Sequence, residues 1–124
     1  MNRLLSFFFG VVVFAACGGA EQPAGPQPVD VGEWCEAVGA SMCRGTADKC
    51  FSGMSGVEDG CRDSFTPSCM GNRDAATPSG RTSDDLGACV DYIESRSCEQ
   101  LGQDTGQALT GSGSFAQLCI LNAG

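Results

Sequence analysis

Cysteine content constrains this chain more than any other feature of its sequence. The chain has nine cysteines in 124 residues, and Cys17 directly follows an apolar N-terminal segment. The other eight are spread through the remainder: Cys35, Cys43, Cys50, Cys61, Cys69, Cys89, Cys98 and Cys119. An even number of cysteines in a short chain that leaves the cytosol is typical of a disulfide framework. We therefore predict four disulfides, each contributing about 2–4 kcal/mol to stability.

Disulfides are needed because the chain offers little for a hydrophobic core. Beyond the N-terminal segment, its aromatic residues are Trp34, Phe51, Phe65, Tyr92 and Phe115. The chain also has 18 glycines, which raise the entropy cost of folding. A domain of this size usually gains only a few kcal/mol net from its core.

The first 16 residues have the pattern of an export signal. Arg3 supplies a positive charge, Leu4 to Phe14 is almost wholly apolar, and two alanines follow. This is the three-part pattern of a secretory signal peptide. The apolar run is shorter than the roughly 20 residues that a membrane-spanning helix requires, so we predict a removable leader.

Phe14-Ala15-Ala16-Cys17 resembles the lipobox of bacterial lipoproteins, in which Leu is followed by two small residues and Cys; the departure is Phe14. The resemblance covers residues 1–17. It implies removal of residues 1–16, a diacylglyceryl thioether on Cys17, and an acyl chain such as palmitate on the new amino group. Two or more acyl chains make the attachment to a membrane stable. The alternative is a simple secretory cleavage that leaves Cys17 unmodified.

The residue after Cys17 bears on localisation. In the families that this lipobox resembles, an Asp there retains the protein at the inner membrane, and this chain has Gly18. The resemblance therefore implies the outer membrane, with the protein facing the periplasm or the cell surface. Residues 17–30 are expected to form the lipidated cysteine and a flexible Pro/Gly-rich linker, and residues 31–124 the disulfide-rich domain.

Apolar residues at helical spacing predict an all-α domain of three main helices plus short ones. The first is expected over 31–44, the second between Ser55 and Pro67, and the third from Thr82 or Ser83. Short helices are expected after Ser97 and Ser114. No stretch shows the sustained alternation of a strand.

The segments between these helices are predicted to be irregular. We expect a turn at 45–48, an exposed loop at 71–82 and a weakly ordered stretch at 102–113, because each is rich in glycine and polar residues. Capping boxes are predicted at Asp30–Glu33, Ser55–Glu58, Ser97–Gln100 and Ser114–Gln117.

Cysteine spacing suggests part of the disulfide pairing. Cys35 and Cys43 lie two helical turns apart, and Cys61 and Cys69 repeat that spacing. Two antiparallel helices could then be joined by Cys43–Cys61 and Cys35–Cys69. Eight cysteines allow about a hundred pairings, so the remaining four stay unassigned. The cysteine order over about residues 34–119 resembles that of uncharacterised small cysteine-rich bacterial lipoproteins, which implies no particular activity.

The residue types present exclude several kinds of catalysis. The chain has no histidine and no Cys-x-x-Cys pair, which disfavours zinc sites, thiol oxidoreductases and Ser-His nucleophiles. The adjacent pairs Glu58-Asp59 and Asp84-Asp85 point in different directions on a helix, so we interpret them as helix-start charges. Single carboxylates occur at Asp63, Asp74 and Asp104, without calcium-loop spacing.

Charge and motifs together predict a non-catalytic protein with no cofactor or metal. A net charge of −8 disfavours nucleic acid as a partner. We expect a lipid-anchored cell-envelope protein, attached to the membrane through Cys17, that binds an unidentified protein or has a structural role. One alternative is a small secreted effector or enzyme inhibitor that presents the 71–82 loop. Another is a hydrolase that uses carboxylates alone.

Overall fold

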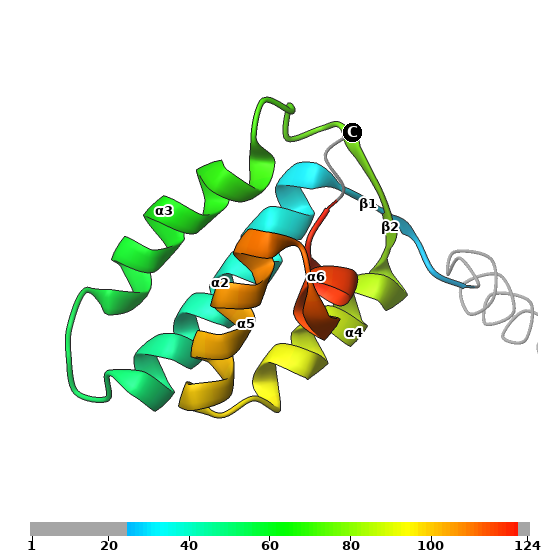
Figure 1. Ribbon diagram of the computed structural model, residues 1–124. Helices are drawn as coiled ribbons and strands as arrows, with labels where there is room; N and C mark the ends of the chain where they lie inside the picture. The colour runs from blue at the N-terminus through cyan, green and yellow to red at the C-terminus, as the bar shows by residue number, and fades with distance from the viewer. Residues whose placement is uncertain (1–24, 122–124) are drawn as a thin grey trace, which may run out of the picture.

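A computed structural model describes residues 25–121, so the expectations for the leader, for Cys17 and for most of the linker lie outside the described residues. The described part contains five helices and a two-stranded sheet (Figure 1). The elements in chain order are β1 (Pro28–Asp30), α2 (Val31–Cys50), α3 (Val57–Met70), β2 (Pro78–Thr82), α4 (Ser83–Glu94), α5 (Cys98–Thr110) and α6 (Gly113–Cys119). The predicted small helical domain with four disulfides is confirmed.

Helix α2 is the element against which the others pack. Its apolar stripe, Val31, Trp34, Val38 and Met42, is buried at the spacing that the sequence predicts. Helix α3 contacts one side of α2, and α4 and α5 contact the other, as Figure 1 shows. The core therefore lies between α2 and the C-terminal helices, with α3 as an outer layer that has no fully buried residue.

Helices α2 and α3 form a hairpin fastened by two disulfides. Cys43–Cys61 lies toward the connecting loop and Cys35–Cys69 toward the open end, with Cα–Cα separations of 5.5 and 5.6 Å. Both pairs are those suggested by the spacing. Pro67 was expected to end or kink this helix, and it does not end it, because α3 continues to Met70. The Cys69 disulfide holds this last turn against α2.

Two segments expected to be irregular are helical. The predicted turn at 45–48 lies inside α2, which runs on to Cys50, and a Cβ added at Gly45 would lie 3.5 Å from Cδ1 of Leu101. Most of the stretch at 102–113 belongs to α5, which extends to Thr110. Tertiary packing has overridden the low helix propensity of glycine in both places.

The predicted loop at 71–82 is only partly a loop. Its last five residues form β2, which pairs antiparallel with β1, so that Val29 lies opposite Arg81. Just before β2, the backbone carbonyls of Ala75 and Thr77 accept hydrogen bonds from the first amides of α2, at 2.9 and 2.8 Å. This segment caps α2 in place of the Asp30 side chain, which makes no capping bond. The sheet also brings the end of the predicted linker into the fold.

Trp34 fixes the C-terminal end of the chain. It is fully buried, and its Nε1 donates a 2.8 Å hydrogen bond to the carbonyl of Cys119. The guanidinium of Arg81 lies 5.5 Å from the ring centroid and donates to the carbonyls of Gln117 and Ile120. The Cys89–Cys119 disulfide ties the same segment to α4.

Capping was predicted correctly at two helices. Thr82 with Asp85 forms a capping box at α4, and Ser97 with Gln100 forms one at α5. The boxes expected at Asp30, Ser55 and Ser114 are wrong. Helices α3 and α6 begin after Gly56 and Ser112, and neither has a side-chain cap.

We expect Gly39→Ala to lower the free energy of unfolding by about 1–3 kcal/mol, because overpacking forces a rigid neighbour to move. A Cβ at position 39 would lie 2.9 Å from Cδ1 of Phe65, in the α2–α3 interface. Guanidinium denaturation followed by circular dichroism measures the change.

Gly60→Ala is the matched control for this substitution. Gly60 is also helical, and nothing lies within 4 Å of its added Cβ. It should stabilise the domain by about 0.5–1 kcal/mol. Equal effects of the two substitutions would show that α2 and α3 do not approach closely at Gly39.

Candidate functional site

The eight cysteines of the domain and Cys17 have to be considered separately. The structure pairs all eight cysteines of residues 25–121 with one another; besides the two hairpin bonds, these are Cys50–Cys98 and Cys89–Cys119. Cys17 lies outside the described residues, so its lipidation stays a prediction. No cysteine of the described part remains unpaired, which leaves no thiol there for nucleophilic or metal chemistry.

The adjacent carboxylate pairs lie at helix starts, as predicted. Glu58 lies 3.6 Å from the guanidinium of Arg44 in a largely exposed ion pair. Asp85 accepts a 2.9 Å hydrogen bond from the backbone N–H of Thr82. This bond holds the pKa of Asp85 below its usual value, and the Thr82 hydroxyl adds to the effect. A carboxylate so occupied in capping is poorly suited to act as a general acid.

Asp104 is the one buried charged residue among those described, and its role was not predicted from the sequence. It is 1% exposed and accepts two hydrogen bonds from Arg96, at 2.9 and 3.1 Å, and one from the Tyr92 hydroxyl at 3.2 Å. Arg96 also lies over the Tyr92 ring, 4.8 Å from its centroid. The cluster joins α4, the turn after it and α5.

Mutual contacts within this cluster shift two of its pKa values. Hydrogen bonds to Asp104 raise the pKa of Arg96, and partial burial together with the Asp104 charge raises the pKa of Tyr92. Both groups therefore keep their protons at neutral pH. The Asp104 carboxylate is enclosed and fully engaged, so the cluster is suited to holding helices together and not to contacting a substrate.

One sequence signal could have revealed Asp104. Leu101, Asp104 and Ala108 recur at helical spacing, and all three face inward in α5. The glycines at 102 and 106 obscured this periodicity.

An open groove of about 1200 Å³ lies between α2 and α3. Small side chains such as Ala37 and Ala40 line it on the α2 side. Its charged residues are Asp30, Glu33, Glu36, Asp59, Arg62 and Asp63. Five of these six are acidic, so the groove carries a negative potential and would attract cationic groups.

The carboxylates of this groove do not converge. Across residues 25–121 no group of three or more candidate ligands is placed to hold a metal ion. The groove can therefore attract a cation through its field without a coordination shell. The 71–82 segment, which the inhibitor alternative would present to a target enzyme, contributes Ala75 to the lining of this groove.

Comparisons with protein-family models, with curated proteins and with solved structures found no match to this chain. Among the helices of residues 25–121, none is both long enough and apolar enough to cross a bilayer.

We expect Asp104→Ala to destabilise the domain by about 3 kcal/mol, because removing one member of a buried ion pair strands its partners. Thermal unfolding and guanidinium denaturation both measure this loss. Asp63→Ala removes an exposed carboxylate from α3 and should change stability by less than about 0.5 kcal/mol. If Asp104→Ala and Asp63→Ala lowered stability by the same small amount, the Asp104 carboxylate would be solvated and not buried.

Asp85→Asn tests the acid dependence of stability. The pKa of Asp85 is lower in the folded protein than in the unfolded chain. Its contribution to the free energy of unfolding is therefore fully present above the unfolded pKa and is lost as pH falls through the folded pKa. The variant should therefore be less stable than the parent at pH 7, and the two should converge in strongly acidic solution. Denaturation midpoints across this range measure the difference, with Asp91→Asn as an exposed control on the same helix. A gap that stays constant with pH contradicts the role of Asp85.

Proposed function

We propose that this chain is a lipid-anchored cell-envelope protein whose folded domain binds a protein partner or serves structurally, without catalysis. The observation that carries the proposal is Phe14-Ala15-Ala16-Cys17 at the end of a short apolar leader. A lipobox-like cysteine in that position implies acylation, and acyl chains supply membrane attachment without a spanning helix.

The cysteine pairing supports a separate role for Cys17. The other eight cysteines satisfy one another within residues 25–121. Cys17, the ninth cysteine, therefore finds no unpaired cysteine among residues 25–121 with which to form a disulfide. Four disulfides in one small domain also favour an oxidising compartment outside the cytosol.

The place where the chain enters the fold suits a tether. Gln27 exchanges two hydrogen bonds with Ser83: its N–H donates to the Ser83 hydroxyl, and its carbonyl accepts from the Ser83 N–H. The segment from Cys17 to Gln27 spans at most about 35 Å when fully extended. A lipid on Cys17 would thus keep the domain within about one domain diameter of the membrane surface.

Surface chemistry favours binding over catalysis. The carboxylates with resolved partners cap a helix, pair with arginine on the surface or hold a buried cluster. The acidic α2–α3 groove is open to solvent and suits a cationic protein surface better than a nucleic acid. The implied location is the outer membrane, because Gly18 follows the lipidated cysteine.

Cys17→Ser tests the anchor directly. We expect the parent protein to fractionate with membranes and to partition into the detergent phase of Triton X-114. The Ser variant should lose both properties, because a hydroxyl cannot form the thioether. Phe14→Leu, which brings the motif closer to the usual lipobox, is the matched control and should stay anchored.

The same experiment separates the alternative function. If the parent protein already appears in the culture medium, and Cys17→Ser does not change its distribution, the result would favour a secreted effector or inhibitor. It would contradict the proposed membrane anchor.

A further inference from the structure

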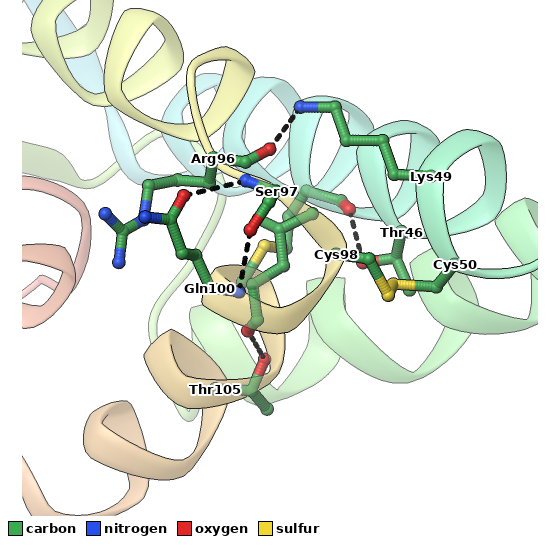
Figure 2. Close-up of a disulfide and its surroundings, with 10 residues drawn as sticks. Thr46, Lys49, Cys50, Arg96, Ser97, Cys98, Gln100 and Thr105 are labelled. Atoms are coloured by element: carbon green, nitrogen blue, oxygen red, sulfur yellow. Dashed lines mark hydrogen bonds between the residues drawn. A yellow bond between two sulfur atoms is a disulfide. The ribbon is translucent and has the colours of Figure 1, made fainter.

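The four disulfides differ in how far each is enclosed. Cys89 and Cys119 are both buried, and Cys35 and Cys43 are buried partners of partly exposed cysteines. In Cys50–Cys98 neither residue is buried. This bond joins the last residue of α2 to the first residue of α5 (Figure 2).

We propose that Cys50–Cys98 is a thiol–disulfide exchange site, which opens to an external thiolate while the other three bonds stay closed. Exchange requires access to one sulfur and a good leaving group at the other. Attack on partly exposed Cys61 or Cys69 would expel a thiolate into the buried surroundings of Cys43 or Cys35, where the loss of water disfavours a charged sulfur. Opening the Cys50–Cys98 bond does not form a thiolate in buried surroundings, because neither cysteine is buried.

The start of α5 makes Cys98 the leaving group. Ser97 is the N-cap, and its side-chain and carbonyl oxygens accept from the N–H groups of Gln100 and Leu101. The N–H groups of Cys98 and Glu99 belong to the open first turn, where partial positive charge stabilises a thiolate. Glu99 opposes this effect, but its side chain is exposed and screened by salt. Cys50 lies instead at the C-terminal end of α2, where the dipole disfavours an anion.

An external thiolate attacks Sγ of Cys50 and forms a mixed disulfide, while the Cys50–Cys98 bond breaks and its electron pair leaves on Sγ of Cys98. With a monothiol the reaction stops there. With a dithiol, the second thiolate attacks its own first sulfur and releases Cys50, so the dithiol is oxidised and the protein bond is reduced.

The surroundings would keep the two thiols close after opening. Nζ of Lys49 donates hydrogen bonds to the carbonyls of Glu94 and Arg96, at 2.9 and 2.5 Å. Figure 2 shows the bond to Arg96. These bonds hold the end of α2 to the turn before α5 independently of the disulfide. Leu101 and Asp104 remain buried in α5. Opening would therefore leave the end of α2 in place, next to the exposed Phe51 and Met54 of the following loop.

The site also lies far from the tether. Helix α2 has 20 residues, and at about 1.5 Å per residue it places Cys50 about 30 Å from β1. An envelope thiol would therefore meet this bond at the opposite end of α2 from the point of chain entry.

The test uses the mature oxidised protein with limiting glutathione in one arm and limiting dithiothreitol in the other. Iodoacetamide quenches each sample, and peptide mass mapping locates the modified cysteines. The dithiothreitol arm should alkylate Cys50 and Cys98 about tenfold faster than the other six. The glutathione arm should place glutathione on Cys50 and carbamidomethyl on Cys98. The far-UV circular dichroism spectrum should be unchanged at this stage.

Three results would overturn the proposal: another bond opening first, all four opening together, or glutathione on Cys98. The Cys89–Cys119 bond is the internal control in every sample. A Cys50→Ala, Cys98→Ala double variant should keep its helical spectrum and lose the fast phase. If a fast phase persists there, the reactive bond lies elsewhere.

Discussion

Three of the four disulfides begin on one helix, α2, and the arrangement of the domain depends on them. Cys35 and Cys43 attach α3, and Cys50 attaches α5. The apolar core is small, with Trp34 and Phe115 as its largest buried members. Because such a core contributes little net stability, cross-links that restrict the unfolded chain supply much of the rest. The fourth bond, Cys89–Cys119, then closes the C-terminal segment over Trp34.

Sequence patterns predicted those features that depend on neighbouring residues. The apolar stripe of α2, the helix start at Thr82 or Ser83, the box at Ser97 and the equal spacing of two cysteine pairs are all local signals, and the structure contains each of them. Local signals failed where distant residues decide the outcome. Gly45 lies within α2, near Leu101 of α5, and β2 pairs with β1, about fifty residues earlier.

The candidate site was predictable to a similar degree. The helix-start role of Asp85 followed from its position, whereas the buried Asp104 cluster required knowing that Tyr92 of α4 and Arg96 of the turn after it approach Asp104. Most remaining acidic residues are exposed, several around the α2–α3 groove. The negative charge around this groove suits the cationic protein partner that we propose for the domain.

The most direct measurement is a non-reducing peptide mass map of the protein purified from its native host, with the N-terminal peptide included. The account predicts four linked pairs, Cys35–Cys69, Cys43–Cys61, Cys50–Cys98 and Cys89–Cys119. It also predicts an N-terminal peptide that begins at Cys17 and carries the mass of its acyl groups. A different set of linked pairs would contradict the framework, and an intact leader or an unmodified Cys17 would contradict the anchor.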